Sequence, residues 1–138
     1  MKDVAYVALG SNLGQRDVFL AQARRSIAHL PQTRVLGETA AEETSAIGPV
    51  QQGPFLNQMI AIETELSPQQ LLLELMRIEK EAGRVRAERW GPRTLDLDIV
   101  LFEKQSVNEA NLRIPHPELS NRPFWLRELT ELRSARVG

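Results

Sequence analysis

The order in which strand-like and helix-like patterns follow each other limits the folds open to this chain. Four segments rich in strand-forming apolar residues predict strands, at 3–10, 33–44, 55–65 and 93–102. Two segments with apolar residues at helical spacing predict helices, at 17–30 and 68–82. The resulting order is the ferredoxin-like βαββαβ pattern. We therefore expect an α+β fold with a four-stranded antiparallel sheet and helices packed on at least one of its faces.

Local signals mark the ends of these helices. Asp17 is the expected N-cap of the first helix. The second helix starts with Ser67 as the N-cap, Pro68 at its first position and Gln70 placed to complete a capping box. Beyond about residue 112, the prolines of "IPHPELSNRPF" predict a loop, and a short helix follows it near the C-terminus.

The composition narrows the class of protein. A chain of 138 residues, of which 42% are apolar, fits one globular domain over residues 1–138. The net charge of −1 argues against a nucleic-acid-binding protein, which usually carries a basic surface. The lack of cysteine excludes disulfides and thiolate metal sites, and no apolar run approaches the ~20 residues of a membrane span. We expect a cytoplasmic monomer with neither a membrane nor a nucleic-acid partner.

The strand 93–102 contains two aspartates, although Asp is depleted in strands. Because side chains alternate across a strand, the odd positions from Leu95 to Leu101 form an apolar face that should belong to the core. The even positions form the opposite face, with Thr94, Asp96, Asp98, Val100 and Phe102. The Cα atoms of the two aspartates should lie about 6.7 Å apart, so that their charges repel by roughly 2–3 kcal/mol. Bound Mg²⁺ would remove this repulsion, but solvent and nearby arginines could also do so, and the pattern alone leaves both possibilities open.

Arginines are concentrated just before this acidic pair. Of 17 basic residues 14 are Arg, and Arg84, Arg86, Arg89 and Arg93 all fall within one short segment. Four arginines beside two carboxylates leave surplus positive charge, which a polyphosphate would balance. Arginine also suits bidentate binding of phosphate. The sequence therefore predicts a phosphoryl-transfer site, in which positioning and electrostatics supply most of the catalysis.

Three further features have both a structural and a functional interpretation. The stretch "GSNLGQR" (10–16) could cradle a phosphate after the first strand, but it lacks the Lys-Ser/Thr of a P-loop, which favours a tight turn that leads into a helix. His116, between two prolines, is either a structural residue or a phosphate contact on a stiff loop. The aromatic residues Phe55, Trp90 and Phe124 either anchor loops or form a slot for a flat heterocycle.

Several stretches together resemble the 6-hydroxymethyl-7,8-dihydropterin pyrophosphokinase family of folate biosynthesis. The similarity runs from about residue 4 to 126, and its quoted stretches are "GSNLG" (10–14), "FLN" (55–57), "RIE…GRVR" (77–86), "RWGPRTLDLDI" (89–99) and "IPHPEL…R.F" (114–124). The resemblance implies a ferredoxin-like fold. It also implies that ATP donates a pyrophosphoryl group to the 6-hydroxymethyl oxygen of the reduced pterin, that AMP leaves, and that two Mg²⁺ ions assist.

The resemblance also implies roles for individual residues. The catalytic residues would be Asp96, Asp98, Arg84 and Arg93, with both aspartates as Mg²⁺ ligands. The ATP contacts would be Glu79, Arg84, Arg86, Arg89, Trp90, Arg93, Ile99, His116 and Arg122. The pterin contacts would be Thr44, Ser45, Ile47, Phe55, Asn57, Trp90, Asp96 and Phe124, where Phe55 and Phe124 sandwich the ring. The family closes mobile loops over its substrates, and 45–54 and 84–92 would be those loops.

The chain also departs from the family pattern. Ser45 and Ala46 stand where prolines are usual, and so do Glu128 and Ser134 near the C-terminus. Two alternatives therefore stay open beside the enzyme. One is a paralogue that binds nucleotide and pterin without catalysis. The other is a small-ligand regulatory domain of the same fold, which would give no reason for Asp96 and Asp98.

Overall fold

The computed structural model describes residues 2–45, 53–82 and 94–137. In chain order, the elements in these residues are β1 (Asp3–Ser11), α1 (Arg16–Ala28), β2 (Thr33–Glu38), β3 (Glu42–Thr44), β4 (Phe55–Thr64), α2 (Pro68–Glu81), β5 (Asp96–Phe102), β6 (Val107–Glu109), β7 (Leu112–Ile114), the 3-10 helix η1 (Leu119–Asn121) and α3 (Pro123–Val137). None of the helices in these ranges is both long and apolar enough to cross a bilayer.

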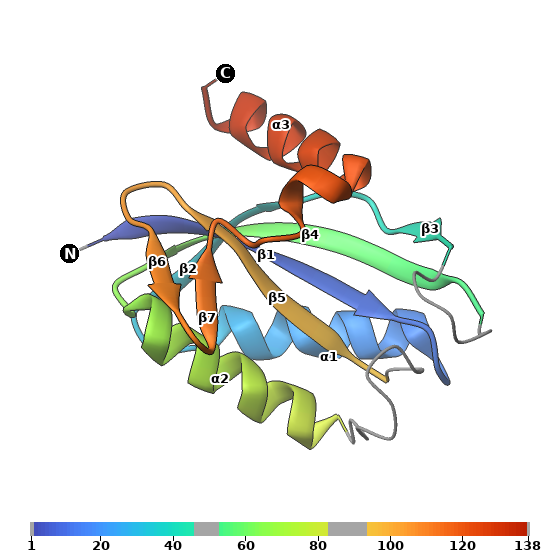
Figure 1. Cartoon of the computed structure of the whole chain (residues 1–138). Coiled ribbons are helices and arrows are strands. Elements are labelled where there is room, and N and C mark those ends of the chain that lie inside the picture. Colours follow the sequence, from blue (N-terminus) through green and yellow to red (C-terminus); the bar gives the residue numbers. More distant parts are fainter. Residues whose placement is uncertain (1, 46–52, 83–93, 138) are drawn as a thin grey trace.

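The main sheet has the strand order β2–β4–β1–β5, and all of its pairings are antiparallel. Two helices, α1 and α2, connect β1 to β2 and β4 to β5 on the same side of this sheet (Figure 1). This arrangement confirms the expected ferredoxin-like α+β fold. β6 and β7 form a separate hairpin (Figure 1).

The predicted strand 33–44 is divided into β2 and β3, so the sheet has five strands where four were expected. The residue responsible is Thr39, which lies between the two strands. Its N–H donates to the Met59 carbonyl over 2.9 Å, and its hydroxyl accepts from the Met59 N–H over 3.0 Å. A side-chain oxygen thus replaces a backbone carbonyl in the ladder, and regular pairing resumes only at Glu42, opposite Asn57.

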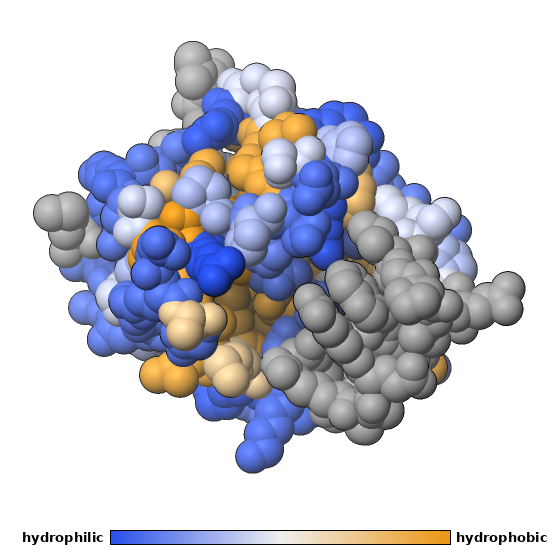
Figure 2. Space-filling model, in the orientation of Figure 1, coloured by the Kyte–Doolittle hydropathy of each residue, from blue (hydrophilic) through white to orange (hydrophobic). Residues whose placement is uncertain are grey.

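Both faces of the sheet are covered by helices. α1 and α2 lie on one face, and α3 lies on the other (Figure 1). The core under α1 and α2 includes Val7, Leu9, Leu20, Ile27, Ile60, Ile62, Leu71, Leu75, Leu97 and Ile99. The core under α3 includes Val4, Tyr6, Ala8, Met59, Ala61, Val100, Trp125, Leu129 and Leu132. With the apolar side chains divided between two cores, the surface in this view is mainly hydrophilic (Figure 2).

A β-bulge changes the alternation of side chains between the two faces of β5 near its end. Along β1, Val7 is opposite Ile99 but Tyr6 is opposite Leu101, so Val100 has no Cα partner in β1. An extra residue of this kind shifts the alternation by one position. The predicted alternation is therefore correct for residues 95–99, where Leu95, Leu97 and Ile99 face α1 and α2. It is wrong for the last two residues, Leu101 and Phe102. Leu101 packs against the core under α3, and Phe102 belongs to the core under α1 and α2.

The two helix starts differ in how well the sequence predicts them. The capping box of α2 is confirmed, because Ser67 Oγ accepts from the Gln70 N–H over 3.1 Å and Gln70 Oε1 accepts from the Ser67 N–H over 2.8 Å. For α1, the prediction that Asp17 is the N-cap is wrong. Gln15 occupies that position without a side-chain capping bond, and Asp17 lies in the first turn, where its charge favours the helix dipole.

The C-terminal part contains more regular structure than its sequence predicts. The loop expected beyond about residue 112 holds β7 and η1, β6 lies just before it, and the expected short helix is the 15-residue α3. Strands of three residues are too short to produce a recognisable pattern. α3 is fixed by Trp125, Leu129 and Leu132, which recur at helical spacing and are all buried against the sheet.

Candidate active site

A row of residues crosses one end of the sheet on the face that carries α3. In this row Asp96 of β5 is opposite Gly10 of β1, and Gly10 is opposite Asn57 of β4. Because neighbouring strands lie about 4.8 Å apart, the Cα atoms of Asp96 and Asn57 are separated by about 10 Å. The next row on the same face contains Asp98 and Ala8, and Ala8 belongs to the core under α3. Asp96 and Asp98 therefore share the α3 face, as the sequence predicts.

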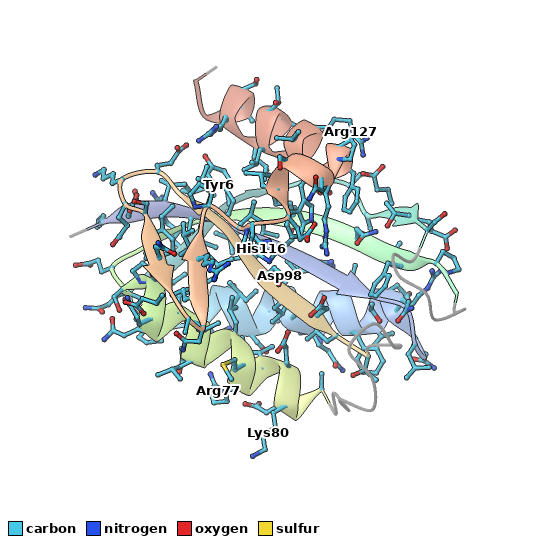
Figure 3. The ribbon with its side chains drawn as sticks, in the orientation of Figure 1. Tyr6, Arg77, Lys80, Asp98, His116 and Arg127 are labelled. Atoms are coloured by element: carbon cyan, nitrogen blue, oxygen red, sulfur yellow. The ribbon has the colours of Figure 1, made fainter. Side chains whose placement is uncertain are left out.

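The acidic pair is only partly buried and has a histidine beside it. The Asp98 side chain keeps 28% of its exposure, and its Oδ1 lies 3.5 Å from Nε2 of His116. Figure 3 shows these two side chains next to each other in front of β5. Within the three described ranges, no group of three or more His, Asp or Glu residues could hold a metal ion. Two partly buried carboxylates on one strand face still fit Mg²⁺, which binds proteins through one or two carboxylates and takes its other ligands from water and phosphate.

His116 is held by three contacts. Its backbone N–H donates to the Val100 carbonyl over 2.9 Å, so the histidine is attached to β5 at the bulge. Its Nδ1 accepts a hydrogen bond from the Glu118 N–H over 3.0 Å, which leaves the proton of the neutral ring on Nε2, directed at Asp98. The edge-to-face contact with Trp125, with ring centroids 5.0 Å apart, fixes the ring plane.

Glu79 and the side chain of Ile99 lie on the other side of the sheet. Glu79, buried on α2, accepts a hydrogen bond from the Leu97 N–H over 2.7 Å. This contact holds the strand at the residue between the two aspartates. The Ile99 side chain lies in the core under α1 and α2, on the face opposite to Asp98. The structure thus places both predicted ATP contacts behind the acidic face.

Three of the predicted pterin contacts lie together where the end of β3 pairs with the start of β4. Thr44 is opposite Phe55, and the Asn57 amide donates to Thr44 Oγ1 over 2.5 Å. Gly10 lies at the base of this group, where a Cβ would be 3.4 Å from Asn57 Oδ1 and 3.4 Å from Phe55 Cδ1. A larger side chain at Gly10 would therefore fill the space between Asp96 and Asn57. Ser45, also predicted, follows Thr44 and is exposed.

The start of α3 brings Arg122 and Phe124 to the same face. The Arg122 guanidinium carbon lies 4.4 Å above the Trp125 ring, and the Phe124 and Trp125 centroids are 6.3 Å apart. Arg122 Nε is buried without a hydrogen-bond partner in the part of the chain that the structure describes. A buried donor without a partner calls for an explanation, and a bound anion would provide one. Trp125 contacts both His116 and Arg122, so it links the two.

Some predicted residues lie outside the described ranges, namely Ile47, Arg84, Arg86, Arg89, Trp90 and Arg93. Two residues of the site were not predicted. Trp125 directly follows Phe124, and this pair of aromatic residues was the available signal. Gly10 opens the quoted stretch "GSNLG" (10–14), but its own role could not be predicted, because it comes from the side chains that the neighbouring strands bring beside it.

Comparisons with known sequences agree with this geometry. The model of the family described as 7,8-dihydro-6-hydroxymethylpterin-pyrophosphokinase (HPPK) matches residues 6–134. The chain is 41% identical over 132 residues to the 2-amino-4-hydroxy-6-hydroxymethyldihydropteridine pyrophosphokinase of Bacillus subtilis, covering 96% of this chain and 79% of the relative. It is 44% identical over 130 residues to the Haemophilus influenzae protein of the same name, covering 94% and 81%.

Solved structures support the fold. A crystal structure described as HPPK-DHPS in complex with substrates superposes with a TM-score of 0.70 at 12% identity. HPPK-DHPS from Plasmodium falciparum with pteroate gives a TM-score of 0.68 at 13% identity. The alignments cover 95% and 91% of this chain, which spans only 40% and 38% of those longer chains. From the sequence matches over nearly its whole length, this chain belongs to the 7,8-dihydro-6-hydroxymethylpterin-pyrophosphokinase family.

Proposed function

We propose that this chain transfers the pyrophosphoryl group of ATP to the hydroxymethyl group of 6-hydroxymethyl-7,8-dihydropterin and releases AMP. The observation that carries the proposal is the row across the sheet, which sets Asp96 at one end and Asn57, with Thr44 and Phe55, at the other. One end of the row offers a carboxylate for Mg²⁺, which would in turn bind the polyphosphate, and the other offers hydrogen bonds and a ring face. The membership of the pyrophosphokinase family supports the same reaction.

The pterin would bind over Gly10. Asn57 and Thr44 carry amide and hydroxyl groups that can read its polar edge, and Phe55 and Phe124 offer ring faces for stacking. In this orientation the hydroxymethyl group points along the row toward Asp96. Holding the acceptor in place before reaction lowers the entropic part of the barrier.

Asp96 and Asp98 would hold Mg²⁺, and two ions are expected from the family resemblance. When bound there, Mg²⁺ neutralises charge on the triphosphate and makes the acceptor hydroxyl more acidic. His116 can donate a hydrogen bond from Nε2 to a phosphate oxygen or to Asp98. The Arg122 guanidinium can bind phosphate. Arg84, Arg86, Arg89, Trp90 and Arg93 are proposed for the same substrate on the basis of the sequence resemblance.

The chemistry balances without a further reactant. The hydroxymethyl oxygen forms a bond to the β-phosphorus of ATP, and the bond between that phosphorus and the oxygen bridging to the α-phosphorus breaks. AMP leaves with the bridging oxygen, and the hydroxyl proton is released. In such a transfer the protein contributes mainly positioning and electrostatic stabilisation.

The product separates this function from its alternatives. With ATP, the reduced pterin and millimolar Mg²⁺, the chain should form AMP and no ADP. The variants Asp96→Ala and Asp98→Ala should form almost no AMP while their circular dichroism stays unchanged. Glu109→Gln, an exposed acidic residue on β6, serves as the matched control. Pterin binding without AMP would instead indicate a non-catalytic paralogue, and normal turnover by either aspartate variant would refute the metal role.

The monomeric state, the cytoplasmic location and the single domain over 1–138 stay predictions.

A further inference from the structure

Arg16 connects the two strand ends that carry the proposed pterin contacts. One guanidinium nitrogen, Nη2, donates to Glu43 Oε1 on β3 over 2.5 Å, and the other, Nη1, donates to the Pro54 carbonyl over 3.0 Å. Glu43 immediately precedes Thr44, and Pro54 immediately precedes Phe55. A single side chain thus contacts the residue before each of two proposed pterin contacts.

The position of Arg16 is itself well determined. It is the first residue of α1, whose Leu20 and Ile27 are buried in the core under that helix. The turn before it depends on Gly14, which has a φ of +75° and whose carbonyl accepts from the Arg16 N–H over 3.0 Å. The same turn holds Asn12, whose amide donates to the Gly53 carbonyl over 3.2 Å. The turn thus holds Asn12 and Arg16 in place, and both side chains contact the residues that directly precede β4, Gly53 and Pro54.

Within the described residues, β3 is otherwise held by its pairing with β4, by the hydrogen bond from Asn57 to Thr44 and by the ion pair between Glu42 and Arg127. β3 has only three residues, Glu42–Thr44, so few ladder hydrogen bonds hold it against β4. The Arg16 side chain is 29% exposed and the Glu43 side chain 56% exposed, so solvent weakens this ion pair, and the second contact, to the Pro54 carbonyl, helps to fix the guanidinium. A guanidinium can bind two acceptors at once in a fixed fork, whereas a lysine offers a single point charge.

We propose that Arg16 is a positioning residue for the pterin, which holds the end of β3 and the start of β4 in register so that Thr44, Phe55 and Asn57 face one ligand. This inference rests on the proposed function. The plain alternative is a surface ion pair that adds little to stability and nothing to the site. The alternative predicts that both substrates are affected equally, or not at all.

The experiment measures the two substrates separately. For Arg16→Ala we expect the KM for the pterin to rise about tenfold, the size expected for losing one charge-assisted hydrogen bond, while the KM for ATP stays within about twofold. Arg16→Lys keeps the charge but loses the fork, so it should give a smaller rise of about threefold. Arg34→Ala is the matched control, because it removes the 3.2 Å ion pair with Glu63 between β2 and β4, far from Phe55.

Direct binding distinguishes this inference from the proposed function. Titration calorimetry with 6-hydroxymethyl-7,8-dihydropterin should show the same tenfold loss of affinity for Arg16→Ala, even if the wild type were to release no AMP. A wild type that is active, combined with an unchanged pterin KM and Kd in both variants at position 16, would overturn the positioning role alone. A wild type that binds no pterin would overturn both proposals. If Arg16→Ala does not fold, the Arg16→Lys data decide.

Discussion

Glu128 provides a prediction whose size follows from the structure. This α3 residue is only 3% exposed, and its Oε2 accepts a hydrogen bond from Thr39 Oγ1 over 3.1 Å. Its Oε1 is buried without a partner among the described residues. Burial raises the pKa of the Glu128 carboxyl from 4.5 to about 7, the Thr39 hydrogen bond lowers it, Glu42 and Glu131 raise it further, and Arg127 lowers it.

The sign of the pH dependence follows from this shift. The folded chain binds the Glu128 proton more tightly than the unfolded chain does, so the stabilising contribution is complete below about pH 4.5 and is lost as the pH rises through about 7. Each pH unit between two pKa values is worth about 1.4 kcal/mol, so the loss amounts to up to about 3 kcal/mol. That is a large part of the 5–15 kcal/mol that stabilises a typical domain.

The variant Glu128→Gln isolates this effect, because glutamine has the same size and stays neutral at every pH. Urea unfolding, followed by circular dichroism between pH 5 and 8, gives the free energy of unfolding of both proteins. Subtracting the two curves removes the contribution of the groups that titrate in both proteins. We expect Glu128→Gln to gain up to about 3 kcal/mol relative to the wild type between pH 5 and pH 8. A difference that stays constant over this range would refute the argument.

Three other perturbations test separate features of the fold and the site. Gly10→Val should raise the pterin KM by at least about tenfold in steady-state assays, because the new side chain would enter the space between Asp96 and Asn57; an unchanged KM would place the pterin elsewhere. Phe102→Ala should lower the free energy of urea unfolding by about 3–5 kcal/mol, and Leu101→Ala, at a partly buried position, by clearly less. Equal losses would contradict the bulge. Chelation by EDTA should stop AMP formation without changing the circular dichroism, and added Mg²⁺ should restore it; activity that survives EDTA would refute a metal role.

The sequence predicts those parts of the fold that depend on local patterns. The capping box at Ser67 and the order of the long strands are properties of short segments, so periodicity reveals them. Periodicity does not reveal the bulge at Val100, because the bulge exists only in the pairing between β1 and β5. The division at Thr39 likewise depends on Met59, twenty residues further along the chain.

The same distinction applies to the candidate site. Asp96, Asp98 and His116 carry reactive groups, which make them visible in the sequence as soon as a motif surrounds them. Gly10 and Arg16 matter through their neighbours on other strands, so a reader of the sequence sees only a turn before a helix. The residues that arrange a site are therefore harder to predict than the residues that act in it.

Compared with β1, the strand β5 contains one extra residue, Val100, at the β-bulge. If Val100 were deleted, Ile99, Leu101 and Phe102 could keep their present partners in β1, and both cores would retain these side chains on the same faces. What would be lost is the buried Val100 side chain of the core under α3 and the carbonyl to which the backbone of His116 is attached. A shortened chain would thus lose core volume under α3 together with the position of a proposed ATP contact, which means that one extra residue serves both packing and the geometry of the site.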